Sequence, residues 1–154
     1  MNKKTEYALI ALKHLQEREQ GYLMSAKEVT ETYQTPFDAT SRVLQRLASG
    51  NWLVSEQGAH GGYKLSKDLD QLSFKELMEI IEGPQSIVKC LAVDASAKKC
   101  DLVETCNMVS PLSNLNTLLL NFLDELSVGD LIRSNSDKKI EIEKLSRLQA
   151  VDLN

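Results

Sequence analysis

The sequence predicts a mainly α-helical fold with one small β-hairpin, and three neighbouring features lead to this prediction. Apolar residues recur at steps of three and four between positions 37 and 48, which is typical of a helix with one buried face. Two short runs, at 52–56 and 63–65, have the composition of strands. The segment between them, QGAHGG, is rich enough in glycine for a tight turn with positive φ at several positions. A helix followed directly by such a hairpin is the plan of a winged helix-turn-helix.

The helix before the hairpin has clear signals at both ends and on both faces. Thr35 and Pro36 are expected to open it as the N-cap and the first helical residue, and Gly50 to end it in the left-handed conformation. Its apolar face is expected to carry Phe37, Val43, Leu44, Leu47 and Ala48. Its opposite face is expected to carry Thr35, Asp38, Arg42, Gln45, Arg46 and Ser49.

The polar face of this helix has residue types that suit DNA. Arginine and glutamine can hydrogen-bond to base edges, and threonine and serine to phosphates. We therefore predict that the helix lies in a major groove and the hairpin against the neighbouring backbone. The predicted DNA contacts are Arg42, Gln45 and Arg46 at base edges or phosphates, Thr35 and Ser41 in positioning the helix, and His60, Gly61 and Gly62 at the tip of the hairpin. Two alternatives are an ordinary amphipathic helix with a solvated polar face, and a surface ion pair formed by Arg46.

Two earlier helices complete the predicted domain. Residues 5–19 form the first, and the run at 7–12 is so apolar that we expect it to be buried on most sides. The sequence SAKE at 25–28 is a capping box that opens the second helix, through about Tyr33. A second capping box, SFKE at 73–76, opens a helix after the hairpin.

The next segments extend the chain beyond the domain, which we assign to residues 1–83. Gly83-Pro84 closes the helix after the hairpin. Residues 84–106 have few periodic signals and are predicted to be an irregular loop that carries all three cysteines. Ser110-Pro111 is predicted to open a long helix within residues 107–133.

This long helix has more apolar residues than one packed stripe needs. Apolar residues recur at alternating steps of three and four, as in the seam of a helical dimer, at Leu112, Leu115, Leu119, Phe122 and Leu126. The seam is widened by Leu118, Leu120 and Leu123. We therefore predict a dimerisation helix and a homodimer, with packing inside one chain as the alternative. Residues 134–154 are a charged tail in which Ile142, Leu145 and Leu148 mark a candidate last helix.

Length and charge limit the possible functions. A chain of 154 residues forms one domain, or one small domain with an extension. The net charge of −4 argues against DNA binding, because nucleic-acid-binding surfaces are usually basic. The acidic residues, however, cluster at 17–31 and 68–82, and basic residues outnumber acidic ones between Thr35 and Lys67. We expect a narrow positive strip on an acidic body, and a dimer that places two strips on one duplex.

No targeting signal or membrane span is predicted, so we expect a cytoplasmic protein without a membrane partner. Cysteines in that compartment are more often thiols or metal ligands than disulfides. The spacing of Cys90, Cys100 and Cys106 lacks the CxxC pair of a zinc ribbon.

Three cysteines in one irregular loop can still converge on a single metal centre. Thiolates select zinc, copper(I) or an iron–sulfur cluster, and the nearby Lys89, Lys98 and Lys99 favour thiolate formation. Three unrelated thiols are the alternative.

The hairpin sequence WLVSEQGAHGGYKL, preceded by RVLQRL at 42–47, resembles the bacterial winged-helix regulators that include IscR and NsrR. In that family the hairpin is roughly G-L-V-x-S-x-x-G-x-x-G-G-Y-x-L. The matching positions are Gly58, Gly61, Gly62, Tyr63 and Leu65, whereas Asn51 and Trp52 replace the usual Gly-Leu. The opening TEYAL, the capping box at 73–76, the cysteine loop and the long helix follow in the family's order, over about residues 1–130.

The resemblance implies a homodimer that binds a palindromic operator and holds one iron–sulfur cluster per subunit, 2Fe–2S or 4Fe–4S, whose state sets the affinity for DNA. Cys90, Cys100 and Cys106 match the family's three ligand cysteines, although the first gap is longer than usual. IscR-like members take a fourth ligand from a histidine three residues after the last cysteine, a position occupied here by Val109. NsrR-like members use a carboxylate from the first helix of the partner subunit, and Glu6 falls at that position.

The sequence also allows other roles for Glu6 and other residues as the fourth ligand. Glu6 can instead interact with the positive end of its own helix, and the other candidate ligands are His14, Asp101 and Glu104. As a hypothesis, cluster ligation ties the cysteine loop of one subunit to the first helix of the other, and so sets the spacing of the two recognition helices. The implied signals are nitric oxide, redox state or iron–sulfur status.

The sequence favours a regulator over an enzyme. It has no nucleophile with a base at sensible spacing and no phosphate loop. The main alternative is a winged-helix regulator without a metal, or one that works through zinc or thiol chemistry. An iron–sulfur carrier or redox enzyme is the less favoured alternative.

Overall fold

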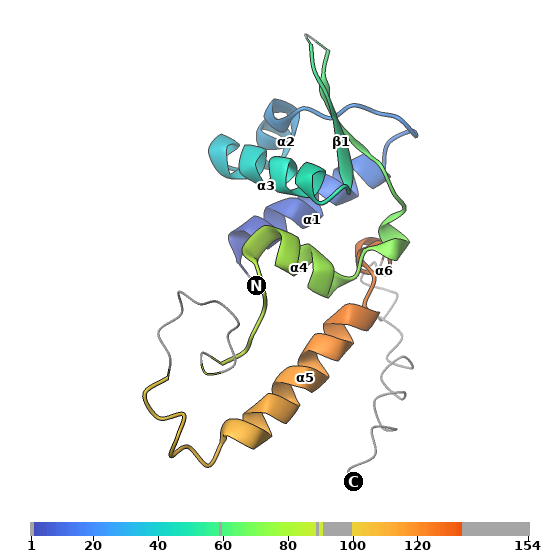
Figure 1. Cartoon of the computed structure of the whole chain (residues 1–154). Coiled ribbons are helices and arrows are strands. Elements are labelled where there is room, and N and C mark those ends of the chain that lie inside the picture. The colour runs from blue at the N-terminus through green and yellow to red at the C-terminus, as the bar shows by residue number, and fades with distance from the viewer. Residues whose placement is uncertain (1, 59, 89, 91–99, 134–154) are drawn as a thin grey trace.

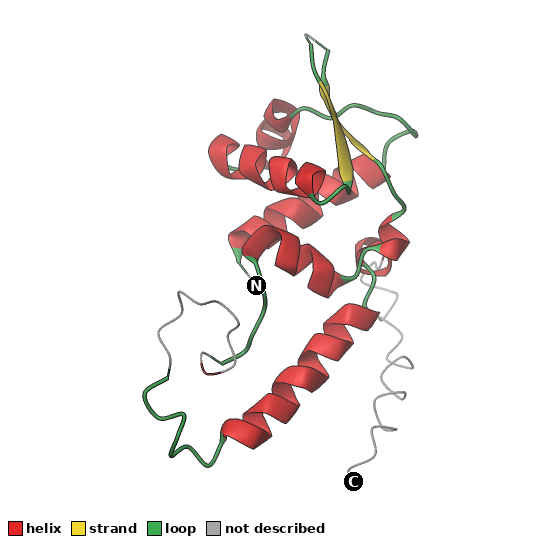
Figure 2. Cartoon of the chain, viewed as in Figure 1, coloured by secondary structure: helices red, strands yellow, loops and turns green. Residues whose placement is uncertain are grey.

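The computed structural model describes residues 2–58, 60–88, 90 and 100–133, and it confirms the predicted fold class, mainly α-helical with a small β wing (Figure 1, Figure 2). The helices are α1 (Lys3–Gln16), α2 (Ala26–Tyr33), α3 (Phe37–Ser49), α4 (Phe74–Glu82), α5 (Val109–Glu125) and α6 (Val128–Arg133), with a short 3-10 helix η1 (Leu69–Gln71). The strands β1 (Leu53–Glu56) and β2 (Gly62–Leu65) form the antiparallel wing. The predicted tail, 134–154, and Lys89, Lys98 and Lys99 lie outside the described residues.

Helix α1 is the central helix of the N-terminal domain, with α2 and α3 on one side and α4 on the other (Figure 1). Its residues Ala8, Ala11 and Leu12 are fully buried. The helix begins at Lys3, earlier than predicted, because the side chain of Asn2 caps it by accepting a hydrogen bond from the Lys4 amide at 3.3 Å. None of the described helices is long and apolar enough to cross a membrane.

Both predicted capping serines are confirmed. The Ser25 hydroxyl accepts a hydrogen bond from the Glu28 amide, and the Ser73 hydroxyl from the Glu76 amide, each at 3.0 Å. The two glutamate side chains bond elsewhere. Glu76 accepts a hydrogen bond from the indole nitrogen of Trp52 at 2.9 Å, which ties the entry of the hairpin to α4.

The start of α3 differs from the prediction. The helix begins at Phe37 with Pro36 at the N-cap position and no side-chain cap. Thr35 is only 6% exposed, since its hydroxyl lies 2.8 Å from the hydroxyl of the buried Thr40. The predictions of Thr35 as N-cap and as part of the exposed face are therefore wrong. Phe37 is 53% exposed, so its predicted place on the buried face is wrong as well.

The end of α3 shows why a glycine stands at position 50. Gly50 has a φ of −79°, and the left-handed residue is Asn51, with a φ of 60°. The prediction of a left-handed Gly50 is wrong. A Cβ at Gly50 would lie 3.1 Å from Cδ1 of Ile80, so this glycine permits the close approach of α3 to α4.

The wing has the predicted hairpin form, with Leu53 paired to Leu65 and Glu56 to Gly62. Met24, before α2, adds two backbone hydrogen bonds with Tyr63 on the free edge of β2, at 2.9 and 2.8 Å. A Cβ at Gly62 would lie 2.7 Å from the carbonyl oxygen of Met24, so this glycine is required by a close contact. Among the described glycines of the turn, only Gly58 has a positive φ, 120°.

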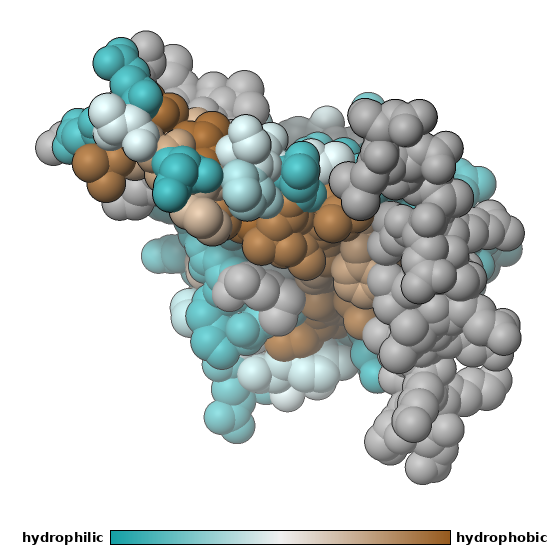
Figure 3. Space-filling view, turned by 90° about the horizontal axis from the view of Figure 1, so that it is seen from below, coloured by the Kyte–Doolittle hydropathy of each residue, from teal (hydrophilic) through white to brown (hydrophobic). Residues whose placement is uncertain are grey.

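The long helix α5 extends away from the domain and is followed by α6, which the sequence did not reveal (Figure 1). Helix α5 begins at Val109, one residue before the predicted start, and none of its residues is buried within the described chain. Val128 and Ile132 of α6, in contrast, join the core. Seen from below, hydrophobic residues form a band across this side of the molecule (Figure 3). The exposed large residues of α5 are Leu115, Leu118 and Leu119.

A polar cluster joins α1 to α2 around His14, which is 3% exposed. Its Nδ1 lies 2.9 Å from the Tyr33 hydroxyl, and its Nε2 lies 2.8 Å from Oε1 of Glu28. The Tyr22 hydroxyl donates to the same carboxylate oxygen at 2.7 Å. Partial burial raises the pKa of Glu28, but the hydrogen bonds from Tyr22 and His14 outweigh it and leave the pKa below its ordinary value of 4.5. The ionised carboxylate therefore helps hold α2 against α1.

The Glu28→Gln variant is expected to lose less unfolding stability than the wild type as the pH falls below about 4.5. Because the pKa of Glu28 is lower in the folded chain, its contribution to stability is present above about pH 4.5 and is lost as the pH falls through the folded-state pKa. Urea unfolding of both proteins between about pH 6 and 3 measures this. The wild type is expected to lose more stability than the variant below pH 4.5, and parallel curves would contradict this role of Glu28.

Candidate nucleic-acid interface and cysteine segment

The exposed face of α3 carries the two best candidates for reading DNA. Arg42 and Gln45 are both exposed, and neither side chain makes a hydrogen bond or ion pair within the part of the chain that the structure describes. They lie on the face opposite the buried Val43, Leu44 and Leu47. The wing projects beyond α2 and α3 (Figure 1). A free arginine and a free glutamine on one helix surface can hydrogen-bond to base edges or phosphates.

Three other predicted contacts, Thr35 before α3 and Ser41 and Arg46 on it, are placed differently. Thr35 is buried, as described above. Ser41 is half-buried, and its hydroxyl oxygen is enclosed without a hydrogen-bond partner among the described residues. Arg46 is exposed, but its Nη1 donates to the backbone carbonyl of Ile81 in α4. Arg46 therefore has a hydrogen-bond partner on α4. The sequence predicted a DNA contact instead or, as the alternative, a surface ion pair.

The tip of the wing presents His60, which is exposed. The Gly61 amide donates to the Gly58 carbonyl at 3.0 Å, so this amide is used inside the turn. A Cβ at Gly61 would lie 2.2 Å from the carbonyl oxygen of Glu56, which explains the glycine by close packing. Lys64 on β2 forms an ion pair with Glu56 on β1. Among the predicted tip residues, the His60 side chain is therefore the group best placed to approach a DNA backbone.

The cysteine segment, residues 84–108 between α4 and α5, contains neither α-helix nor β-strand in its described part, as predicted for 84–106. Its thiols, those of Cys90, Cys100 and Cys106, are all free and half-buried. The described residues contain no group of three histidine, cysteine, aspartate or glutamate side chains close enough to hold a metal ion. The donor chemistry suits a thiolate-bound centre, but one described chain does not gather the donors.

Glu6 lies in the first turn of α1 and pairs with Lys3, whose Nζ is 2.6 Å from Oε2 of Glu6. This hydrogen bond raises the pKa of Lys3 above its usual 10.5. Of the other candidate ligands, Asp101 and Glu104 are exposed within the cysteine segment. His14 has both ring nitrogens hydrogen-bonded in the α1–α2 cluster, so its candidacy as a ligand is contradicted by the structure.

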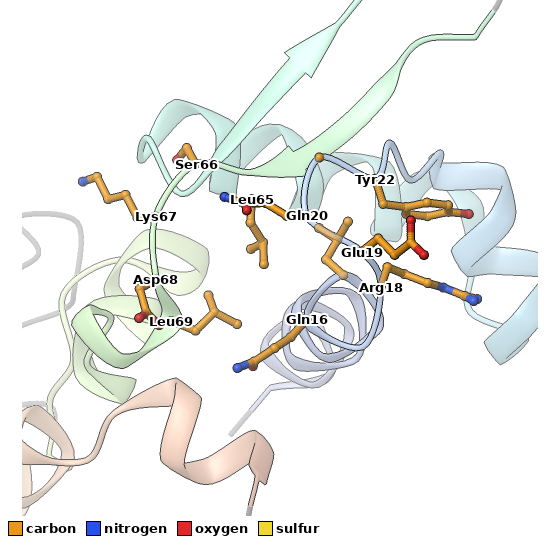
Figure 4. A pocket seen from close by; sticks show the side chains of 12 residues that line it. Gln16, Arg18, Glu19, Gln20, Tyr22, Leu65, Ser66, Lys67, Asp68 and Leu69 are labelled. Carbon is orange, nitrogen blue, oxygen red and sulfur yellow. The ribbon is translucent and has the colours of Figure 1, made fainter.

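A shallow pocket lies between the end of α1 and the link from β2 to η1 (Figure 4). Leu65 and Leu69 point into it, whereas Arg18 and Lys67 point away (Figure 4). None of the predicted DNA contacts or metal ligands lines this pocket.

Sequence reasoning missed two features of the site. The exposed Phe37 stands at the first helical position of α3, next to the residues predicted to contact DNA, and helical spacing alone assigned it to the core. The bond from Arg46 to α4 joins residues 35 positions apart, and no local pattern in the sequence signals it. Ser41 directly follows the buried Thr40 and is half-buried, which helical spacing did not signal.

Three helices and a projecting wing define a winged-helix DNA-binding domain, and comparison with known proteins gives the family. Residues 1–134 match the family model Rrf2, described as iron-dependent transcriptional regulator. The chain belongs to this family, and it is a transcriptional regulator.

One relative is similar in sequence, and two solved structures are similar in fold. The chain is 26% identical to the HTH-type transcriptional regulator NsrR of Bacillus subtilis (strain 168) over 133 residues, which cover 86% of this chain and 90% of that protein. The fold is similar to that of CymR, the global cysteine regulator of B. subtilis, with a TM-score of 0.63 and 20% identity over 86% of this chain and 95% of the other. It is also similar to that of T. potens IscR, with a TM-score of 0.62 and 16% identity over 94% and 95% of the two chains.

Proposed function

We propose that this regulator binds a palindromic DNA operator as a homodimer, and that an iron–sulfur cluster on Cys90, Cys100 and Cys106 controls its affinity. The observation that carries the DNA-binding part is the pair of exposed side chains of Arg42 and Gln45 on α3, which have no partner among the described residues. In a helix-turn-helix protein the second of the two helices lies in the major groove, which is the place proposed for α3.

The dimer rests on the apolar surface of α5. This helix exposes Leu115 at 46%, Leu118 and Leu119, and buries none of its residues in the described chain. A second copy of α5 covers such a surface and sets two α3 helices on one duplex, one or more helical turns apart. Two narrow positive strips then act on one DNA molecule, which offsets the net charge of −4.

The cysteine chemistry supports a cluster in the assembled dimer. Three free, half-buried thiols occupy one segment between α4 and α5, and thiolates are the usual protein ligands of iron–sulfur clusters. The family description, iron-dependent transcriptional regulator, favours iron. When bound, the cluster supplies a centre that reacts with nitric oxide or oxidants. Glu6 of the first helix is the proposed fourth ligand, and to serve as one it leaves its ion pair with Lys3.

A second candidate is regulation through the thiols themselves. The described cysteines do not converge on a metal group, and the fold is equally similar to that of the global cysteine regulator CymR. In this case the same DNA-reading surface responds to reaction of a cysteine, without a bound metal.

Anaerobic purification with an absorption spectrum and iron and sulfide assays separates the two candidates. The cluster function predicts visible absorbance, with matching amounts of iron and sulfide on each chain. A colourless, iron-free protein, even after anaerobic reconstitution, would contradict the cluster and leave thiol regulation. Selection of duplexes from a random library tests DNA binding separately.

Phe37 is expected to contact thymine methyl groups. It is exposed at the first position of α3, where apolar side chains can meet the 5-methyl group of thymine in the major groove. Replacing a contacted thymine by deoxyuridine removes one methyl and is expected to weaken wild-type binding about fourfold, since burial of one such group stabilises by about 0.8 kcal/mol. The Phe37→Ala variant should be insensitive to the same replacement. Equal sensitivity of both proteins at every thymine would contradict the contact.

A further inference from the structure

The last turn of α4 is bonded to two other helices at the point where the cysteine segment begins. Nη1 of Arg46 in α3 donates to the carbonyl oxygen of Ile81. The Thr5 hydroxyl and the Asn2 amide, at the start of α1, both donate to Oε1 of Glu82. The chain then turns at Gly83, with a φ of 89°, into the cysteine segment. We call residues 81–83 the junction.

Arg46 supplies a hydrogen-bond donor and a positive charge to the C-terminal end of α4. The last four carbonyl groups of an α-helix have no N–H partner within the helix, and they carry partial negative charge. Helix α4 has no basic residue in its last turn. The guanidinium of Arg46 therefore brings both a hydrogen bond and a positive charge from the neighbouring helix, and it is held against α4 rather than left unpartnered like Arg42.

Helices α3 and α4 are also in close contact next to this bond. Gly50 at the end of α3 permits contact with Ile80, and the Trp52 indole that follows α3 donates to Glu76 of α4 at 2.9 Å. Leu47 of α3 and Leu77 of α4 are fully buried in the same core. The bond from Arg46 to the Ile81 carbonyl therefore lies at a close-packed contact between the two helices.

We propose that Arg46 is a positioning residue, which transmits the state of the cysteine segment to the recognition helix through the Ile81 carbonyl, and that it is not a DNA contact. This inference rests on the proposed DNA binding, but it holds for either cysteine chemistry. A change at the cysteines that draws Gly83 away from α4 breaks the bond to Arg46 and releases the end of α3. The placement of Arg42 and Gln45 in the groove then changes.

Linkage supplies the test, because DNA binding must favour one state of the cysteine segment if that state affects DNA binding. We would use iron-free, reduced, full-length protein and a duplex of about 30 base pairs, long enough for two half-sites, selected by the wild type from a random library. Alkylation of each cysteine by iodoacetamide is followed by mass spectrometry. Saturating duplex is expected to change the rate at Cys90 by about fivefold or more in the wild type, the lower end of typical couplings, and not at all in Arg46→Met.

Arg42→Met is the matched control, since it makes the same chemical change one turn earlier on the same helix. It is expected to weaken DNA binding yet keep the wild-type ratio of alkylation rates at saturation. The salt dependence of binding gives a second readout, because loss of one phosphate contact lowers the slope by about one. Arg46→Met is expected to keep the wild-type slope. A lower slope with an unchanged ratio of rates would overturn the proposal and make Arg46 a DNA contact.

Two further measurements keep the test decisive. Thermal unfolding checks that Arg46→Met folds, and Arg46→Gln is the second variant if it does not. If the wild type selects no duplex, the proposed DNA binding fails, and hydrogen exchange tests the junction without DNA. Alkylation of the cysteines is then expected to speed exchange at residues 46–49 in the wild type and to have no effect in the Arg46 variant. Unchanged exchange in the wild type would overturn the junction's role.

Discussion

Replacing Arg42 and Gln45 together by alanine is expected to weaken operator binding by about 100-fold or more. Each well-formed contact to a base edge contributes about 1–3 kcal/mol of discrimination, and both side chains are exposed and unpartnered among the described residues. Fold stability should stay within about 0.5 kcal/mol of the wild type, because exposed residues away from caps and networks contribute little. Titration of the selected duplex by fluorescence anisotropy measures the affinity.

Lys27→Ala is the control for this double variant. Lys27 is 77% exposed on α2 and pairs with Glu31 at 3.7 Å, so its loss removes a surface charge away from α3. It is expected to change affinity only slightly through the overall field of the molecule. If the double variant binds as well as the control, α3 does not read the operator.

The second large effect is expected at the cysteines. Changing Cys90, Cys100 and Cys106 together to serine should reduce bound iron and sulfide to background, because a hydroxyl is a far poorer ligand than a thiolate for iron–sulfur clusters. The thiols are half-buried and outside the core, so the iron-free variant should unfold at the wild-type denaturant concentration. Iron and sulfide assays after anaerobic reconstitution measure the loss.

Glu104→Gln provides the control in the same segment, since it changes an exposed candidate oxygen ligand and leaves all three thiols in place. Iron binding is expected to remain in this variant. Glu6→Ala is expected to shorten the lifetime of the cluster without preventing its formation, because three thiolates remain. Full iron loading of the triple serine variant would show that the metal is held elsewhere.

The sequence predicted those features that depend on neighbours along the chain. The capping serines Ser25 and Ser73, the pairing of the wing strands and the exposed Arg42 and Gln45 all follow from short patterns. A serine three residues before a glutamate predicts a capped helix start. Polar residues three and four apart predict an exposed helix face.

The errors lie where distant residues meet. Helical spacing could not show that Arg46 bonds to Ile81, which is 35 positions away. Glycine-rich composition predicted positive φ, whereas Gly50 and Gly62 are explained by contacts with Ile80 and Met24. Helix α6 was missed because its six residues are too few for a periodic pattern, and its stability comes from packing and from its backbone bond to Leu72.

The candidate metal site was the least predictable part. Three cysteines in one segment give the chemistry of the donors, but their convergence depends on contacts that spacing does not encode. Glu6 was placed by family resemblance, and its partner in the structure is Lys3. Ligation by a partner subunit depends on how two α5 helices meet, which a single chain does not contain.

Control of DNA binding by the cluster is measured as the affinity of one wild-type preparation for the selected duplex, first as purified without oxygen and then after removal of iron by a chelator. The affinity is expected to differ by about 5- to 150-fold between the two states, the range of typical couplings between sites, and this difference is expected to be lost in the triple serine variant. Equal affinities of an iron-loaded and an iron-free preparation would contradict control of DNA binding by the cluster.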